Sequence, residues 1–512
     1  MLIAGAFGAS AEVVYNRGNS ADPESLDPHK TSTVYEANIL RDLFMGLVVQ
    51  DAGANLIPGA AESWTISPDG TVYTFKLRTG ALWSNGDPVT AGDFVFAFQR
   101  LQLPDTGAEY ASMLYPVKGA EEVNQGKGKP EDMGVKAVDD QTLEITLKSP
   151  TPYFLELLTH QATYPVHRKS VETLGADFVK PGNLVSNGAY TLAEFVPNDH
   201  IRLVKNPKFY DAANVQIDVV NYFPTEDRST ALKRFEAGEL DSNDDLPTEQ
   251  LADIRARLGD QVHIGPYLGT YYYAFKSDKA PWTEPKLRRA ISMAIDRDLL
   301  AEKIWSNSMI PAYSFVPPGI PGYESRMADY AASSQLDRED EAKRILAELG
   351  YGPDKPLKLE LRFNTSENHR NTAVAVQDML KPLGIEVTLV NTDTKTHYGL
   401  LEQHADFDVA RAGWIADYKD PETFLRLATT GDGNNYSLYS NPEYDGLMKA
   451  AAAEPDPAKR LGLLSDAEAI FMRDTPYIPL LYYSYHDLVS PKLKGWQDNV
   501  MDVHPTRFLR KE

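Results

Sequence analysis

Two helix-and-strand units follow one another between residues 339 and 390 and leave few choices for the fold of this region. In each unit an amphipathic helix pattern stops at a glycine, Gly350 or Gly384, and a run with strand composition comes next. A helix that connects neighbouring strands of one sheet normally makes those strands parallel. The sequence therefore predicts an α/β lobe with a mostly parallel sheet. The expected helices cover 339–349 and 373–383, and the expected strands cover 357–363 and 385–390.

The chain is too long for one hydrophobic core. It has 512 residues, whereas single cores stop growing at about 250 to 300 residues, so we expect two or three lobes. We place a crossover between lobes just after the strand-like run 268–275 and before a long helix expected at 286–304. Residues 61–100 combine a hairpin, which turns at 68–70, with a helix that begins after Thr90. Another helix is expected at 37–49.

Charge and composition exclude several classes of partner and site. The chain has 51 Lys and Arg residues and 73 Asp and Glu residues, which gives a formal charge of −22. Nucleic acid and anionic lipid need clustered cations, so neither is expected as a partner, whereas cationic ligands are mildly favoured. The absence of cysteine rules out disulfides, thiolate metal sites and cysteine nucleophiles.

The first eleven residues have the composition of a targeting segment. The run MLIAGAFGASA is apolar and rich in small residues, and it ends in Ala9-Ser10-Ala11. This is typical of the end of a secretory signal peptide with its cleavage site, although the basic segment that should precede it is missing. We expect residues 1–11 to be a signal-peptide remnant; a flexible N-terminal arm is the alternative.

Motifs for common enzyme chemistry are missing from the sequence. We find no phosphate-binding glycine loop, no HExxH, no nucleophile elbow and no closely spaced histidines. The segment GDGNN at 431–435 lacks the full spacing of a calcium loop, and we interpret it as a turn. A Ser/His/Asp triad stays open, because its members need not be neighbours in the sequence.

The segment RAGWIADYKDP, residues 411–421, carries a candidate binding site. It follows a short alternating run that is typical of a strand. Gly413 allows a close approach of another backbone, Trp414 offers a broad apolar face, and Asp417 supplies a carboxylate. Such a combination could receive the N-terminal ammonium group of a peptide. The alternative is a strand end with a packed Trp and an Asp that caps a turn.

Tyrosine is common, with 27 residues. Tyr110 and the run 271–273 could line a ligand cavity, where a phenol supplies apolar area and a hydrogen bond. Core packing explains such residues equally well.

Short segments along nearly the whole chain carry a resemblance to one protein family. In order, they are SLDPHK, RDLFMGL, the block 61–100, SNGAY, GTYYYAF, LRRAISMAIDRDLL, RAGWIADYKDP and NNYSLYSNPEYD. With these segments, residues 13–512 resemble the periplasmic oligopeptide-binding proteins, which are solute-binding components of ABC importers in the dipeptide/oligopeptide/nickel-binding family.

The resemblance implies an α/β fold with two lobes joined by a hinge and an extra α+β domain inserted in the first lobe. A ligand that touches both lobes would stabilise the closed form. The implied divisions are lobe I at 12–57, 170–267 and 485–512, the extra domain at 58–169, and the second ligand-binding lobe, lobe III, at 268–484.

The resemblance also implies how the ligand is held. Asp417 matches the carboxylate that pairs with a peptide's α-ammonium, and Arg411 matches a position that can face the ligand's carboxylate. The backbone at Gly413 and Ile415 matches a strand edge that pairs with an extended peptide. The remaining implied ligand-binding positions are the backbone of Met45 and Leu47, the cavity-lining Tyr110, Tyr272, Trp414 and His369, and Asp244, which replaces an Asn.

Several positions depart from the family pattern. Met45 and Ala274 stand where well-known peptide binders often carry Glu, and Trp305 and Gln403 stand at or near the positions of cations that meet the peptide's C-terminus. These departures leave peptide length and C-terminal recognition open.

The resemblance implies a monomeric periplasmic protein without catalytic activity, cofactor or metal. It would capture short peptides and deliver them to ABC permease subunits in the inner membrane. A binder specialised for murein peptide or another amine-bearing conjugate is the main alternative. A secreted hydrolase and a chaperone-like role are rivals from other classes.

Overall fold

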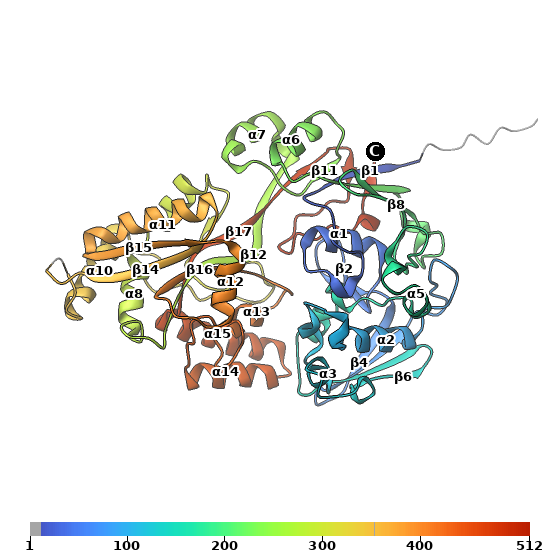
Figure 1. Ribbon diagram of the computed structural model, residues 1–512, viewed down its shortest axis with the longest axis horizontal. Coiled ribbons are helices and arrows are strands. Elements are labelled where there is room, and N and C mark those ends of the chain that lie inside the picture. Colours follow the sequence, from blue (N-terminus) through green and yellow to red (C-terminus); the bar gives the residue numbers. More distant parts are fainter. Residues whose placement is uncertain (1–11, 353) are drawn as a thin grey trace, which may run out of the picture.

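The computed structural model describes residues 12–352 and 354–512, and the expected signal-peptide remnant at 1–11 lies outside them. Figure 1 shows two bodies side by side. The first lobe is the body built around strands β1 and β8–β10, and the second lobe is the body built around β14–β16. Long strands, labelled β12 and β17 in Figure 1, cross between them.

One sheet extends through both lobes. Within the described residues, eleven strands form it in the order β15-β14-β16-β12-β17-β11-β1-β10-β9-β8, and β13 pairs with β17. The strands are β1 (Val14–Asn19), β8 (Tyr190–Val196), β9 (His200–Lys205), β10 (Val219–Pro224), β11 (Ser242–Asn243), β12 (Val262–Phe275), β13 (Ile310–Pro311), β14 (Leu357–Asn364), β15 (Ile385–Thr392), β16 (Val409–Ile415) and β17 (Tyr477–Val489).

Strands β12 and β17 connect the lobes. They have 14 and 13 residues, against a usual strand of about 5 to 6. Their antiparallel pairing shifts register between Pro266 and Thr270. On one side of this shift β17 meets the first-lobe strand β11, and on the other side β12 meets β16. The shift therefore lies where the sheet passes from one lobe to the other.

The first lobe also contains a separate sheet, a four-stranded antiparallel one in the order β4-β5-β7-β6. Helix α2 covers it with Phe94, Phe98 and Leu101, all fully buried. The helix begins after Thr90, which forms a capping box with Asp93. The elements of this lobe outside the long sheet are β2 (Val48–Gln50), β3 (Leu56–Pro58), β4 (Ala61–Ile66), β5 (Val72–Leu77), β6 (Val135–Asp139), β7 (Thr142–Thr146), α1 (Val34–Leu43), α2 (Ala91–Gln102), α3 (Ala120–Asn124), α4 (Phe154–Leu157), α5 (Arg168–Leu174), α6 (Arg228–Glu236), α7 (Leu251–Leu258), β18 (Leu493–Lys494) and β19 (Arg510–Lys511).

Helices flank the sheet of the second lobe (Figure 1). Its apolar residues form one continuous core from Leu268 to Leu481. No helix within 12–352 or 354–512 is both long and apolar enough to cross a membrane. The helices are α8 (Pro285–Ala294), α9 (Arg297–Leu299), α10 (Gln335–Glu348), α11 (Glu367–Leu380), α12 (Thr394–Glu402), α13 (Glu422–Leu425), α14 (Pro442–Ala453) and α15 (Pro457–Asp474).

The predicted helix-and-strand units are present, but the sheet is less parallel than predicted. Strand β14 runs parallel to β15 and β16, and Gly350 and Gly384 follow their helices with φ of 82° and 76°. However, β12 pairs antiparallel with both β16 and β17. These long strands enter from the other lobe, which the local pattern could not indicate.

Two predicted helices are wrong in extent. The helix expected at 286–304 breaks at Ile295, because the Asp296 side chain accepts a hydrogen bond from the Leu299 amide and so starts a new helix. The helix expected at 37–49 ends at Leu43, because Phe44 is extended and the chain continues into β2. The domain divisions stay predictions, since one core contains residues of both the expected lobe I and the expected extra domain.

Candidate ligand-binding cleft

A cavity of about 440 Å³ lies between the lobes. The first lobe contributes Arg41, Tyr110 and His160 to its wall, and Ile415 and Asp417 come from the end of β16. Tyr110 stacks on His160 with ring centroids 4.5 Å apart. Burial and the nearby Arg41 lower the pKa of His160 to about 3, so this imidazole is neutral.

Asp417 is a half-buried carboxylate two residues after β16. No hydrogen bond or ion pair from the described residues reaches its oxygens. Burial raises its pKa to about 6, and the positive charge of Arg426 offsets part of that effect. Burial and the charge of Asp417 together raise the pKa of Tyr110 to about 12, and both residues line the interlobe cavity.

Asp417 also borders a second cavity of about 490 Å³, between the first lobe and helices α13 and α14. Beside it the lobes touch, because the ring of Tyr153 stacks on Tyr418 at 5.2 Å with an interplanar angle of 3°. The Lys419 ammonium group adds a hydrogen bond to the Ala54 carbonyl. The carboxylate therefore stands between two cavities, close to the point where the lobes meet.

Strand β16 has an open edge next to Asp417. On one side it pairs with β12 along its whole length, and the Ala416 amide continues this contact to the Leu268 carbonyl at 2.8 Å. On the other side β14 pairs with it at Val409 and Ala410. Among the described residues no strand continues this pairing beyond Ala410.

Alternation along the strand decides which backbone groups lie on that open edge. In an antiparallel pair, the N–H and C=O of one residue point to the partner strand and those of the next residue point away. Because the Ala416 amide faces β12, the backbone groups of Gly413 and Ile415 face the open edge. The Arg411 carbonyl lies on the same edge and accepts a hydrogen bond from His397 Nε2 at 2.7 Å. Gly413 and Ile415 are thus positioned to pair with an added strand.

A side chain at position 413 would collide with Tyr483. A Cβ atom built on Gly413 would lie 2.6 Å from the Tyr483 hydroxyl. Trp414, the next residue, is half-buried and donates from Nε1 to the Thr423 hydroxyl at 3.1 Å. The Arg426 guanidinium lies 5.2 Å from its ring centroid, which fixes the indole against the wall of the second cavity.

Arg411 is buried, and none of the described residues gives it a carboxylate partner. Its Nη atoms donate to the Tyr398 and Tyr483 hydroxyls, each at 2.9 Å, and to Asn364 Oδ1 at 3.2 Å. The guanidinium also lies 4.6 Å from the ring centroid of Tyr271. Because these partners are neutral, the site holds an uncompensated positive charge and would favour an anionic group.

His369 completes the surroundings of Arg411. Its Nδ1 lies 3.3 Å from the Tyr271 hydroxyl, and its ring lies 6.3 Å from that of Trp305. Burial, and to a smaller extent the positive charge of Arg411, lower the pKa of His369 to about 3. The imidazole is therefore neutral and can exchange donor and acceptor roles with a bound group.

The structure does not bring every predicted residue to the cleft. Tyr272 is fully buried, and its ring packs against Phe315 and Tyr477 in the core of the second lobe. Successive strand residues point to opposite faces, so its neighbour Tyr271 is the one that reaches Arg411 and His369. The run of three tyrosines could not show which of them reaches Arg411.

Met45 and Leu47 do not line the interlobe cavity, and three of their four backbone hydrogen-bonding groups have partners within the first lobe. The Met45 amide donates to Asn187 Oδ1 and its carbonyl accepts from Asn187 Nδ2, both at 2.9 Å. The Leu47 carbonyl accepts hydrogen bonds from Gly59 and Ala61, both at 3.1 Å. A peptide cannot pair with backbone groups that already have these partners.

Asp244 lies in the first lobe beside a different set of charges. Its carboxylate accepts a hydrogen bond from Asn38 Nδ2 at 2.9 Å and lies 3.6 Å from Arg17 Nε. It lines neither of the cavities that Asp417 borders. Sequence reasoning missed Arg41, His160 and Tyr267 of the cleft wall, because none of them is near residues 411–421 in the sequence.

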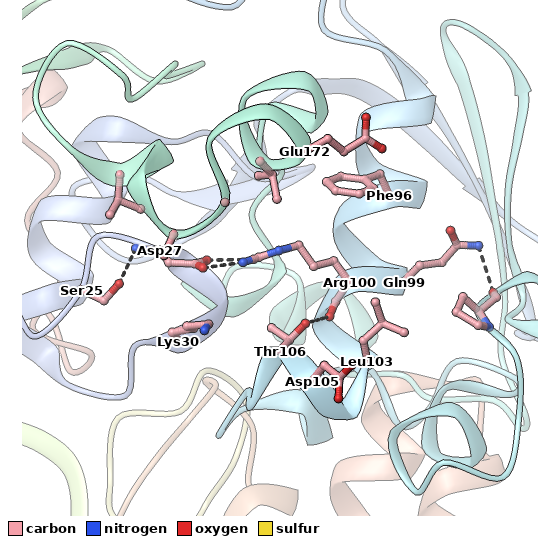
Figure 2. Close-up of a pocket in the computed structure, with 15 residues that line it drawn as sticks. Ser25, Asp27, Lys30, Phe96, Gln99, Arg100, Leu103, Asp105, Thr106 and Glu172 are labelled. Carbon is pink, nitrogen blue, oxygen red and sulfur yellow. Dashed lines mark hydrogen bonds and ion pairs between the residues drawn. The ribbon is translucent and has the colours of Figure 1, made fainter.

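A larger pocket, of about 570 Å³, lies within the first lobe between residues 25–30, α2 and α5 (Figure 2). The charged groups at its centre neutralise one another, since Arg100 holds the Asp27 carboxylate with two hydrogen bonds of 3.0 and 2.6 Å. Its walls, which include Phe96 and Leu103, are mostly apolar. The interlobe cleft, with its unpartnered carboxylate, is the stronger candidate.

Comparison with known proteins identifies the family to which this protein belongs. A family model described as bacterial extracellular solute-binding proteins, family 5 Middle, matches residues 55–436. The chain belongs to this family. As a family 5 solute-binding protein, it has the two-lobed α/β fold that its solved relatives share.

The relatives of this family 5 protein cover nearly its whole length. The periplasmic oligopeptide-binding protein OppA of Escherichia coli is 40% identical over 484 residues, 94% of this chain and 89% of that protein. The periplasmic murein peptide-binding protein MppA of Escherichia coli is 39% identical over 492 residues, 95% of this chain and 91% of that protein.

Solved structures of such proteins superpose over 98% of this chain. The unliganded open form of MppA, 38% identical, gives a TM-score of 0.88 and is covered to 98%. The Haemophilus influenzae OppA complex with the peptide RPPGFSPFR, 37% identical, gives a TM-score of 0.80 and is covered to 99%.

Proposed function

We propose that this protein captures short peptides between its lobes in the periplasm and delivers them to the permease of an ABC importer in the inner membrane. Its relatives named for oligopeptide and murein peptide binding support the ligand class. The observation that carries the proposal is the half-buried Asp417 carboxylate, which lacks a partner and lies at the end of an open strand edge.

The ligand's amino terminus pairs with Asp417 in this proposal. The buried carboxylate has no positive charge paired with it, and the ligand's ammonium group supplies one. Its binding therefore lowers the pKa of Asp417 and stabilises the ionised carboxylate. The extended peptide then adds to β16 by backbone hydrogen bonds with Gly413 and Ile415. All peptides share these backbone groups, so the site accepts many sequences. Tyr110 lines the space for side chains, whereas Trp414 packs under Arg426 and lines neither cavity that Asp417 borders.

In this proposal Arg411 and His369 form the far end of the site, although neither lines the two cavities that Asp417 borders. A ligand carboxylate that reaches Arg411 would neutralise a buried charge that phenols and an amide now surround. The neutral His369 can add one hydrogen bond. Peptides whose carboxylate reaches this point should therefore bind more tightly than longer or shorter ones.

We propose no catalytic step. The described residues contain a Ser/His/Asp chain, in which His167 Nδ1 lies 2.8 Å from the Ser170 hydroxyl and Nε2 lies 3.0 Å from Asp87. However, His167 caps helix α5 by accepting a hydrogen bond from the Ser170 amide, and none of the three residues lines a described cavity. This arrangement stabilises a helix end and offers no substrate access.

Isothermal titration calorimetry with tri-alanine and N-acetyl-tri-alanine tests the proposed function. We expect one tri-alanine per protein and binding weakened at least tenfold by acetylation, which removes the charge that Asp417 pairs with. Equal binding of both peptides would show that the carboxylate does not anchor the ligand. Turnover of either peptide would support the hydrolase instead.

A further inference from the structure

Arg41, in the last turn of α1, is a cation without a partner. It is half-buried, and its Nε atom has no contact with solvent and no hydrogen-bond acceptor. No hydrogen bond or ion pair within the described residues reaches its guanidinium. By contrast, Arg460 has a bidentate pair with Asp420, with both distances 2.7 Å. Buried guanidinium groups are normally satisfied in this way.

The surroundings of Arg41 explain why it lacks a partner. On one side a void of about 20 Å³ separates it from Met45, Tyr164 and a second cation, Arg507. The thioether of Met45 is at most a weak acceptor. On the other side Arg41 borders the interlobe cavity of about 440 Å³. The guanidinium therefore has unused donors and an open space in front of it.

The carboxylates near Arg41 do not neutralise it. Asp502 lines the same cavity but is engaged by His504, whose Nε2 lies 3.0 Å from its oxygen. Asp417 borders the cavity from the second lobe and, in the proposed function, receives the ligand's ammonium group. Burial lowers the pKa of Arg41, and the opposite charge of Asp502 offsets only part of this effect. A guanidinium nevertheless stays protonated in proteins, so its charge must find an anion or remain costly.

We propose that Arg41 determines specificity by binding a carboxylate near the ligand's amino terminus, so that the preferred peptides carry an acidic side chain at the first or second residue. The inference rests on the proposed function, because it takes the position of the amino terminus from Asp417. One cavity then presents an unpartnered anion and an unpartnered cation to the same end of the peptide. Arg411 serves carboxylates at the other end.

Calorimetry with Ala-Glu-Ala and Ala-Gln-Ala, which differ by one charge, tests this inference. The native protein should bind Ala-Glu-Ala roughly ten- to a hundredfold more tightly, the usual effect of a charge-assisted hydrogen bond. Arg41→Gln should remove this preference, so that the variant binds Ala-Glu-Ala and Ala-Gln-Ala with equal affinity. Arg41→Lys should keep part of it, because lysine retains the charge without the planar fork.

Arg507→Gln is the matched control. Arg507 lies beside the same void, but it does not line the interlobe cavity and donates to the Tyr210 hydroxyl at 3.2 Å. We expect this variant to keep the native preference. Circular dichroism and the melting temperature would confirm that each variant is folded.

Three results would overturn the inference. If the native protein binds both peptides equally, Arg41 does not recognise an acidic side chain. If Arg41→Gln keeps the preference for Ala-Glu-Ala, a group other than Arg41 recognises the acidic side chain. If Arg507→Gln loses the preference as Arg41→Gln does, the effect comes from general charge. A protein that binds none of these peptides would instead refute the proposed function, and the inference with it.

Discussion

Replacing Asp417 with Asn should weaken ligand binding and stabilise the empty protein. The substitution keeps the shape of the side chain and removes its charge. Burial raises the pKa of this carboxyl from 3.8 to about 6, so ionisation at pH 7 costs the folded protein roughly 3 kcal/mol at 1.36 kcal/mol per pKa unit. Solvent access reduces this figure, and we expect the free energy of unfolding to rise by about 1 to 3 kcal/mol.

The pH dependence follows from the direction of the shift. Below about pH 4 the carboxyl is protonated in both the folded and the unfolded chain, so Asp417→Asn should not change stability. Between about pH 4 and pH 6 the carboxyl is ionised in the unfolded chain but still protonated in the folded one, so the free energy of unfolding of the native protein falls below that of the variant. Above about pH 6 the difference between the two free energies of unfolding is constant.

The assay is thermal unfolding of ligand-free protein at pH 4 and pH 7, paired with calorimetry of tri-alanine. We expect the variant to melt higher at pH 7, to melt at the same temperature at pH 4, and to bind about ten- to a hundredfold more weakly, as expected for loss of a charge-assisted hydrogen bond. A variant that is less stable at pH 7 would show that Asp417 has a structural partner in the folded protein and would refute this reasoning.

Three further predictions concern other parts of the cleft. Gly413→Val should reduce peptide binding at least tenfold in calorimetry, since a Cβ meets the Tyr483 hydroxyl at 2.6 Å and the added side chain occupies space beside the open edge; unchanged affinity would mean that the ligand does not use this edge. Arg411→Gln should weaken binding of a free tripeptide about tenfold but not of its C-terminal amide, and an equal loss for both would remove Arg411 from carboxylate recognition. Tyr272→Phe should leave affinity unchanged and stability equal or higher, because the buried hydroxyl has no hydrogen-bond partner; a loss of affinity would place Tyr272 in the cavity.

The part of the site that could be predicted from sequence is the part that is local. Gly413, Ile415 and Asp417 follow one another at the end of one strand, so a single segment contained the edge and the carboxylate. The open edge itself depends on where β14 stops pairing, at Ala410, and no pattern within 407–421 shows this.

Residues whose role depends on distant partners could not be assigned in the same way. The backbone of Met45 is taken by Asn187, which lies 142 residues away in the chain. Arg41 is notable because no described residue pairs with it. The sequence around Arg41 cannot show that a partner is missing. The antiparallel course of β12 and β17 likewise comes from pairing between remote segments.

Native mass spectrometry of the protein as purified tests the central claim most directly. Bound molecules would be released and identified from the native protein and from Asp417→Ala. We predict a series of short peptides on the native protein that is lost from the variant. One defined compound that is not a peptide, held equally by both proteins, would contradict the account.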